Sequence, residues 1–520
     1  MGASVKRFVT FAEAFGFGVL ALAVAGALAV GWRFKEFNYD EMLRAHSVWL
    51  TSRGLHPYRG FFECHPPYFP LLTWAVRWAD EPRAYLSVLR AVGLAGNLMF
   101  LAGLLTLGLA TARVRRWAVL GLAAVAVAPG VLDSLVEFRM DGWGYALAVW
   151  GLVLFRRRAD GAYRAFEFGL VSAVATLVLC PKLTLFPALT FLCELLRPGA
   201  TWRGALGRFT AFAAGAAVAG VAVAAYLHLE GMGVREAFDG VYRYNAAINA
   251  HSGFGYGMAR EVGRLWWLSA PVALGVAVWV AGLLSRRERP DPYLAAVALW
   301  LAAQPLLVAS PYKQYFGPWF LFAGVFLGRP GEALERVSNR LGSAAFWACV
   351  VATSALAVVS ASKLADPAPT ARMFRTIDWV RRAIPPGDPV VVDPQLHPLD
   401  RPDTFYFWFN TYDPGGFDGE HAVGTIPALQ AKVSEAHYRA ELKARPPALV
   451  LVSMPRFPVL YPDRQARLLG TFLQEEGYHV VSVGGARFAL RPEAYRRAGR
   501  LGLLPGFPRP AASHAAPFGG

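Results

Sequence analysis

The chain has 520 residues, of which 55% are hydrophobic and only 17% are charged, and its mean hydropathy is +0.35. Ordinary soluble domains carry about 25% charged residues, so this deficit argues against a soluble enzyme and predicts a polytopic α-helical membrane protein. The net charge of +16 does not indicate a nucleic-acid partner, because the basic residues form short clusters between apolar segments, as the positive-inside rule describes.

Apolar segments long enough to cross a bilayer recur through the first two thirds of the chain. At about 20 residues per crossing they predict about eleven transmembrane helices and a transmembrane domain over residues 1–362. The expected limits are 11–33, 84–111, 117–134, 141–155, 165–180, 183–196, 207–229, 263–284, 292–309, 314–328 and 343–362. The short segments 165–180 and 183–196 are separated by Pro181-Lys182, so a single kinked element is the alternative there.

Arginine marks every second connection between these segments. The five connections contain Arg113, Arg115 and Arg116; Arg156, Arg157 and Arg158; Arg197, Arg203 and Arg208; Arg286, Arg287 and Arg289; and Arg329, Arg336 and Arg340. This pattern places them in the cytoplasm together with the N-terminus. We therefore expect a multi-pass protein of the inner (plasma) membrane. The external parts would be the connections 34–83, 135–140, 181–182, 230–262 and 310–313, and the C-terminal part of the chain.

The sequence changes character after residue 362, where Pro-rich turns and short β-branched segments replace the long apolar ones. Residues 390–392, 448–452 and 479–483 predict strands, and residues 428–442 and 463–475 predict helices. This alternation indicates a small α/β extracytoplasmic domain over residues 363–504. The tail 505–520, rich in Pro, Ala and Gly, is expected to be disordered.

The connection 34–83 is the longest between spans, and loops of that length usually carry a function. Asp40 and Glu41 begin a segment whose helical periodicity, through Ser52, predicts an amphipathic helix along the membrane surface. A carboxylate beside a membrane suits a general base, since burial raises its pKa towards the working range. The alternative is that both acids only stabilise the start of the helix through its dipole.

Isolated ionisable residues occur at other external connections as well. Glu137, Arg139 and Asp141 alternate in sequence, so they share one side of an extended turn. Lys182 is a lone cation between two short spans, and Lys313 begins a later one. A cation at membrane depth indicates a function by default, although a lysine near a helix end also reaches the interface by snorkelling. Together these residues indicate a site for an anionic ligand, with local salt bridges as the alternative.

Aromatic residues accompany the charges on the same external side. The loop 230–262 contains Tyr244, and Tyr315 stands at the entry to the span 314–328. Aromatic side chains suit sugar binding by stacking, although an ordinary mobile loop has the same composition. His65, in the sequence His-Pro-Pro-Tyr, has no partner at metal-ligand spacing, so no metal or other cofactor is indicated.

These features, in this order, resemble the polytopic glycosyltransferases of the GT-C fold. The residues that carry the resemblance are the acidic pair after the first span, His65-Pro66-Pro67, Arg139-x-Asp141, Lys182, and a Tyr-rich entry to a late span followed by Pro318. The resemblance covers residues 5–365 and is closest to the bacterial branch similar to protein O-mannosyltransferases and lipid A aminoarabinose transferases.

The resemblance implies an inverting transferase that moves a sugar from a polyprenyl-phosphate-linked donor to an extracytoplasmic lipid, glycan or protein. It implies a catalytic role for Asp40 and Glu41, donor phosphate binding by Lys182, Arg139 and Lys313, and substrate contacts from His65, Asp141, Glu137, Tyr244 and Tyr315. A secondary transporter or lipid flippase is the alternative. Transporters commonly contain internal repeats and ionisable residues at the bilayer midplane, and the sequence shows neither.

Overall fold

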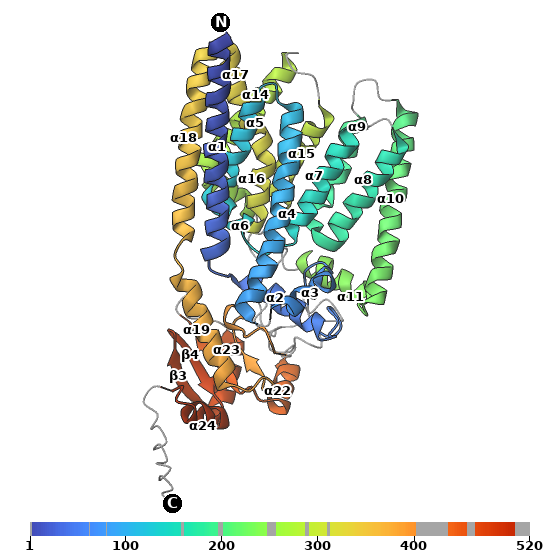
Figure 1. Ribbon diagram of the computed structural model, residues 1–520. Helices are drawn as coiled ribbons and strands as arrows, with labels where there is room; N and C mark the ends of the chain where they lie inside the picture. The colour runs from blue at the N-terminus through green and yellow to red at the C-terminus, as the bar shows by residue number, and fades with distance from the viewer. Residues whose placement is uncertain are drawn as a thin grey trace, which may run out of the picture.

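In the computed structural model, long helices stand side by side as a bundle and the C-terminal part of the chain packs against one end of it (Figure 1). The N-terminus lies at the opposite end of the bundle. The structure describes residues 3–61, 63–79, 81–157, 161–195, 201–246, 256–285, 291–308, 312–401, 435–454 and 463–504. The predicted tail 505–520 lies outside these residues.

The bundle and its connections contain most of the helices. They are α1 (Ala3–Phe34), α2 (Tyr39–Ser52), η1 (Phe69–Leu72), α3 (Trp74–Trp78), α4 (Pro82–Thr111), α5 (Arg115–Ala126), α6 (Pro129–Leu135), α7 (Asp141–Arg157), α8 (Ala162–Val174), η2 (Ala175–Leu179), η3 (Pro181–Leu183), α9 (Leu185–Leu195), α10 (Trp202–Leu229), α11 (Val234–Phe238), η4 (Asp239–Tyr244), α13 (Gly257–Arg264), α14 (Trp266–Leu284), α15 (Pro292–Leu307), α16 (Lys313–Leu327), α17 (Arg329–Val337) and α18 (Asn339–Leu364).

Among the described residues, six helices are long and apolar enough to cross a membrane, or seven if one bent pair forms a single span. That pair is α5 and α6, which meet at an angle of 82°. The sequence predicted one span over 117–134, and the structure divides it into these two helices. Pro129 cannot continue a preceding helix and instead occupies the first turn of α6, so the chain turns sharply there. The bend places Asp133 at the end of the bundle that carries α2.

A second interruption separates α8 from α9. Helix α8 passes into the π-helical turn η2, Cys180 then takes an extended conformation, and Pro181 begins the short 3-10 turn η3. Two short helices are therefore present, as the sequence predicted, and Lys182 lies in the turn between them. Because this turn breaks the regular helix, the lysine side chain is directed towards neighbouring elements.

The described arginine-bearing connections meet at the end of the bundle that carries the N-terminus (Figure 1). Arg116 forms ion pairs with Glu13 of α1 and Glu335 of α17, and Arg156 pairs with Asp291 at 2.9 Å. The expected grouping of these connections at one end is thus confirmed for the described residues. Arg158, Arg197, Arg286, Arg287 and Arg289 lie outside them.

Helix α2 begins where the sequence predicted a helix, and it carries a capping box. The side chain of Asn38 accepts a hydrogen bond from the Glu41 N–H, and the Glu41 carboxylate accepts one from the Asn38 N–H. The helix does not lie on a membrane surface, however. Met42, Ala45 and Val48 are completely buried, because α2 is enclosed between the bundle and the C-terminal part of the chain.

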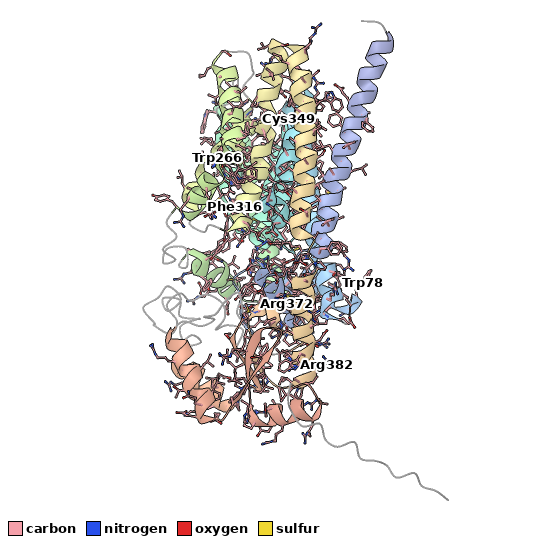
Figure 2. All side chains as sticks on the ribbon, turned by 90° about the vertical axis from the view of Figure 1, so that its left-hand side faces the viewer. Trp78, Trp266, Phe316, Cys349, Arg372 and Arg382 are labelled. Carbon is pink, nitrogen blue, oxygen red and sulfur yellow. The ribbon has the colours of Figure 1, made fainter. Side chains whose placement is uncertain are left out.

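The aromatic residues of the connection 34–83 divide into two groups. Tyr58, Phe61 and Tyr68 are buried, so they do not contribute to an aromatic belt at the membrane surface. Trp74 and Trp78 of α3 are exposed, and Figure 2 shows Trp78 on the outside of the molecule between the levels of Cys349 and Arg382. This position suits a side chain in the interfacial region of a bilayer.

The C-terminal part of the chain forms a small sheet with helices. It contains α19 (Ala368–Ala383), β1 (Val390–Val391), η5 (Pro394–Leu396), α22 (Glu435–Ala444), β2 (Leu449–Ser453), α23 (Asp463–Glu475), β3 (His479–Val483), β4 (Ala486–Leu490) and α24 (Pro492–Arg500). The strand order is β1-β2-β4-β3, with β1 parallel to β2 and the other pairs antiparallel. The three strands and the helix 463–475 predicted from sequence are present, while part of the predicted helix 428–442 lies outside the described residues.

Strand β4 was not predicted, although the sequence carries a signal for it. Gly484 and Gly485 both have positive φ angles and form the turn that joins β3 to β4, with Val483 opposite Ala486. A Gly-Gly pair between two apolar segments is a typical hairpin turn. Residues of this sheet and of α2 pack together in one hydrophobic core.

The arrangement predicts that Arg53, after α2, and Arg340, at the start of α18, face opposite sides of the membrane. Both side chains are exposed. In a chain whose four free cysteines are replaced by alanine, we expect an impermeant maleimide to label Arg53→Cys and Arg340→Cys from opposite sides of sealed vesicles. Labelling of both positions from the same side would contradict this arrangement.

Candidate functional site

A buried ion pair between Glu41 of α2 and Arg90 of α4 forms the innermost part of a charged cluster. The Glu41 carboxylate accepts two hydrogen bonds from Arg90, at 2.9 Å from Nε and 2.7 Å from Nη2. It also accepts the backbone N–H of Phe138 at 2.8 Å and that of Asn38 at 3.2 Å. Glu41 is 0% exposed and Arg90 1%. The pair therefore joins α2, α4 and the segment that follows α6.

A close backbone approach places Glu137 and Arg139 beside this ion pair. A Cβ atom on Gly93 of α4 would lie 2.8 Å from the Glu137 carbonyl oxygen and 3.0 Å from the Arg139 nitrogen. Only a glycine allows the extended segment between α6 and α7 to run so near α4. The alternating side chains that the sequence indicated are consequently presented at the end of the bundle.

Glu137 forms ion pairs with three cations in the interior of the cluster. Its carboxylate accepts hydrogen bonds from Lys35 at 2.9 Å and from the Arg139 Nε at 2.8 Å, and the Lys313 Nζ lies 2.5 Å away. Lys35 and Lys313 also pair with Asp133 of α6. Because Glu137 is completely buried, it holds these cations in place and has no surface available for a substrate.

Asp40 occupies the open edge of the cluster. Its side chain is 27% exposed, the Arg139 Nη2 donates a hydrogen bond to Oδ2, and the Arg44 Nη2 lies 3.9 Å from the same atom. Burial by itself raises the pKa of Asp40, but the charges of Arg139 and Arg44 outweigh it, so the pKa lies well below the usual value. Asp40 is therefore an accessible carboxylate that stays ionised in the absence of ligand.

Lys182 lies at the same open edge. Its Nζ donates a hydrogen bond to Asp141 of α7 at 2.5 Å and lies 4.4 Å from the centre of the Tyr315 ring. The side chains of Lys182 and Asp141 are both 18% exposed. The cation, the acid and the aromatic ring thus come from three different elements and meet where solvent reaches them.

His65 connects the cluster to the connection after α2. The Arg44 Nη2 lies 3.0 Å from the His65 Nε2, and the His65 Nδ1 lies 2.6 Å from the Glu63 Oε1. Because a guanidinium only donates hydrogen bonds, Nε2 accepts and the proton resides on Nδ1, which donates to Glu63. His65 therefore orients Arg44 towards Asp40.

Glu63, Cys64 and His65 have ligand atoms within 4.8 Å of one another, and this is the metal-compatible group among the described residues. The Glu63 Oε1, however, already accepts hydrogen bonds from the Cys64 and His65 backbone N–H groups and from the His65 ring. Burial also raises the pKa of the Cys64 thiol well above its usual value, which disfavours the thiolate that a metal requires. These side chains serve the hydrogen-bond network of the cluster.

The structure brings together most of the residues that the sequence singled out. Asp40, Glu41, Glu137, Arg139, Lys313 and His65 form one connected network of ion pairs and hydrogen bonds, with Lys35 and Arg44 as links. Lys182, Asp141 and Tyr315 form a second, adjacent group. Tyr244 is buried in η4. The neighbouring Asn245 donates a hydrogen bond to the Cys64 carbonyl.

Sequence reasoning missed Lys35, Arg44, Glu63, Arg90 and Asp133. Arg90 carried the clearest signal, because it stands alone inside the predicted span 84–111, where an ionisable residue needs a partner. Asp133 was hidden within the span 117–134, whose bend at Pro129 was not anticipated. Lys35 and Arg44 flank the acidic pair at spacings that an ordinary helix end also shows.

Three buried donors beside Asp40 have no hydrogen-bond acceptor among the described residues. They are the Nη1 atoms of Arg44 and Arg139 and the hydroxyl of Tyr68. Buried guanidinium N–H groups without acceptors are costly, and an anion with several oxygens satisfies them. The open edge therefore combines an accessible carboxylate with the donors that an oxyanion needs.

The two acids of the pair should differ in their effect on stability. Glu41→Gln leaves Arg90 buried without its charge partner, so we expect a loss of about 3 kcal/mol. Asp40→Asn lies at the exposed edge and retains an acceptor for Arg139, so a loss below about 1 kcal/mol is expected. Thermal unfolding of the two purified variants in detergent measures the difference. Equal destabilisation by both substitutions would contradict the placement of Glu41 in the buried, innermost part of the cluster.

Most of the chain is similar in structure to ArnT from Cupriavidus metallidurans, a protein of the GT-C fold. The similarity to apo ArnT has a TM-score of 0.55 at 11% identity and covers 94% of this chain and 98% of ArnT. The similarity to ArnT bound to undecaprenyl phosphate has a TM-score of 0.60 at 12% identity and covers 92% and 98%. No protein-family profile and no curated protein sequence matches the chain. The protein therefore has the GT-C fold that the sequence features resembled.

Proposed function

We propose that the protein is a membrane glycosyltransferase that moves a sugar from a polyprenyl-phosphate-linked donor to an acceptor hydroxyl. The observation that carries this proposal is the open edge, where the accessible carboxylate of Asp40 adjoins buried, unsatisfied donors of Arg44 and Arg139. The fold adds support, since a protein with the same fold was solved with undecaprenyl phosphate. General base and oxyanion site are the two parts that such a transfer requires.

The donor phosphate would bind at the open edge. The free N–H groups of Arg44 and Arg139 and the hydroxyl of Tyr68 supply hydrogen-bond donors, and Lys182 supplies a positive charge beside them. An apolar cavity of about 520 Å³ lies next to the turn that carries Lys182, lined among others by Thr176, Leu177 and Thr184. Such a cavity suits the first isoprene units of a lipid whose phosphate reaches the cluster.

The reaction follows from these positions. The acceptor hydroxyl oxygen attacks the anomeric carbon, its proton passes to the Asp40 carboxylate, and the bond from that carbon to the phosphate oxygen breaks. The leaving phosphate takes the bonding electron pair, and Arg139 and Lys182 stabilise its charge. A carboxylate acting on the face opposite the leaving group gives inversion at the anomeric carbon. Asp40 later releases the proton to solvent.

Donor binding would also activate the base. Arg139 and Arg44 hold the pKa of Asp40 below its usual value, which makes it a weak proton acceptor. A phosphate beside the same arginines adds negative charge and competes for their N–H groups, so the pKa of Asp40 rises. The base therefore becomes effective when the donor is in place.

We assign Glu41, Glu137 and Lys313 a positioning role in this reaction. The Glu41 carboxylate already accepts four hydrogen bonds, and Glu137 is enclosed by cations. Lys313 is bound to Asp133 and Glu137, so its release is needed before it contacts a phosphate directly. His65 positions Arg44, and Asp141 and Tyr315 position Lys182.

We further infer that the open edge and the C-terminal part of the chain face the extracytoplasmic side. The arginine-bearing connections lie at the other end of the bundle, and such connections remain in the cytoplasm. A lipid-linked donor suits that side, because nucleotide sugars are cytoplasmic metabolites. The transporter alternative gains no support, since the charged cluster lies at the end of the bundle and not at its middle.

Substitution of Asp40 should abolish transfer without loss of the fold. Asp40→Asn removes the proton acceptor while keeping its volume, so we expect transfer from a polyprenyl-phosphate sugar to fall by at least about 100-fold. Asp40→Glu, which retains a carboxylate, should preserve part of the activity. Reconstituted vesicles with defined donors measure both rates. Transfer by Asp40→Asn at the wild-type rate would remove Asp40 from the catalytic role.

Substitution of Lys182 should affect the donor more than the acceptor. Lys182→Ala removes a charge beside the phosphate position, and we expect the KM for the donor to rise by about 10-fold or more. The KM for the acceptor should change little. Lys363→Ala, at an exposed lysine near the end of α18, is the matched control. An unchanged donor KM in Lys182→Ala would show that this lysine does not bind the phosphate.

A further inference from the structure

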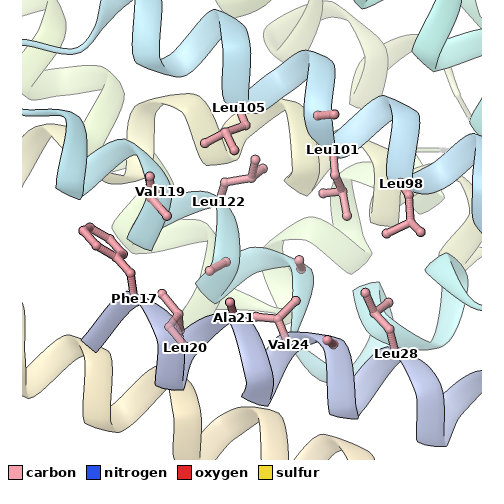
Figure 3. Close-up of a pocket in the computed structure, with 14 residues that line it drawn as sticks. Phe17, Leu20, Ala21, Val24, Leu28, Leu98, Leu101, Leu105, Val119 and Leu122 are labelled. Carbon is pink, nitrogen blue, oxygen red and sulfur yellow. The ribbon is translucent and has the colours of Figure 1, made fainter. Parts of the chain in front are cut away.

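A second apolar cavity, remote from the charged cluster, lies between α1, α4 and α5. It has a volume of about 500 Å³, and Figure 3 shows side chains from the three helices directed into it. All of its lining residues are apolar, among them Phe17, Ala21, Leu28, Leu98, Ala102 and Val119. We call this cavity the α1 groove.

The groove exists because α1 is held at its two ends and packs along α18 rather than α4. At one end Glu13 pairs with Arg116 of α5. At the other end Arg90 of α4 donates a hydrogen bond to the Lys35 carbonyl at 2.8 Å. Between these attachments, small side chains such as Ala21 and Ala102 leave the space between the helices unfilled.

The length of the groove matches the depth of one leaflet of a bilayer. From Phe17 to Leu28 the helix rises about 16 Å at 1.5 Å per residue. Half of the hydrocarbon core measures about 15 Å. The groove begins one turn of α1 after Glu13, which pairs with Arg116 at the arginine-bearing end of the bundle, and it extends past the middle of α1 to Leu28.

Two exposed arginines stand at the mouth of the groove. Arg113 and Arg115 precede Val119 in the turn before and at the start of α5, and Arg115 is about 6 Å from Val119 along the helix axis. Neither guanidinium forms an ion pair with a residue that the structure describes. The neighbouring Arg116 differs, since its charge is matched by Glu13 and Glu335.

We propose that the α1 groove binds one acyl chain of an anionic phospholipid from the leaflet at the arginine-bearing end, with the lipid phosphate at Arg113 and Arg115. The apolar lining and the one-leaflet depth fit the chain, and the two arginines fit the headgroup. The polyprenyl donor fits less well, because its phosphate belongs at the opposite end of α1, beside Lys35 and the charged cluster. The acyl chain occupies the space between α1 and α4, where the two helices make little contact with each other.

Native mass spectrometry of the full-length protein, with added phosphatidylglycerol or phosphatidylcholine, tests the proposal. We expect wild type to retain phosphatidylglycerol about tenfold more than phosphatidylcholine, since each arginine near the headgroup contributes a severalfold factor. Arg113→Gln combined with Arg115→Gln should remove this preference. Equal retention of the two lipids by wild type would overturn the anionic headgroup.

Filling the groove should displace the lipid. Ala102→Phe and Ala21→Phe place a ring from either side into the open space, and each should reduce phosphatidylglycerol retention to the level of phosphatidylcholine. Ala214→Phe, at an exposed alanine on α10, is the matched control and should retain the lipid. Retention unchanged in both groove variants, at an unchanged thermal midpoint, would overturn the site. Displacement of phosphatidylglycerol by undecaprenyl phosphate in wild type would assign the groove to the donor and equally overturn the proposal.

Discussion

An ion pair almost without contact to solvent, Glu41 with Arg90, joins the helix after the first span to the body of the bundle. Two charges removed from water stabilise a structure only when their hydrogen-bonding capacity is filled. Here Glu41 accepts four hydrogen bonds, and the Arg90 guanidinium also donates to the Lys35 carbonyl and lies 3.7 Å from the centre of the Phe37 ring. A shift of α2 along the bundle would break all of these contacts at once. The pair thereby fixes the direction in which the preceding residue, Asp40, faces.

Within the cluster, the exposure of the side chains increases from this pair towards the open edge. Glu137 and Arg139 are enclosed, whereas Asp40, Lys182 and Asp141 reach solvent at the edge. Each cation at the edge is already matched by an acid, so the cluster by itself carries little excess charge. A phosphate that binds there must therefore loosen existing pairs, and Lys182 with Asp141 is the pair with the fewest other contacts. An enzyme needs both properties in one site. The rigid, buried part of the cluster positions the reacting groups, and the adjustable edge admits them.

The sequence predicted that the site residues lie at one end of the bundle. It did not predict which residue each of them pairs with. Alternation of arginine-bearing and arginine-poor connections places Asp40, Arg139 and Lys182 at one end of a helical bundle whatever the packing of its helices. Which acid meets which cation depends on tertiary contacts that no local pattern encodes, such as the approach of α4 to residues 137–139 at Gly93. Asp133 was missed for a related reason, because hydropathy does not report an 82° bend between two apolar helices. The burial of α2 was missed because its cover comes from residues more than 300 positions away in the sequence.

Helix α1 links the charged cluster to the α1 groove. Its last residues carry Lys35 to Glu137, and its first turns are attached to α5 through Glu13 and Arg116. Between these two attachments the groove separates α1 from α4, so the helix has fewer packing contacts there than its length allows. There α1 packs along α18 but has little contact with α4, so few contacts oppose a tilt towards α4, and any such tilt moves Lys35 relative to Arg90. Packing in the groove and the geometry of the charged cluster are therefore physically coupled through a single helix.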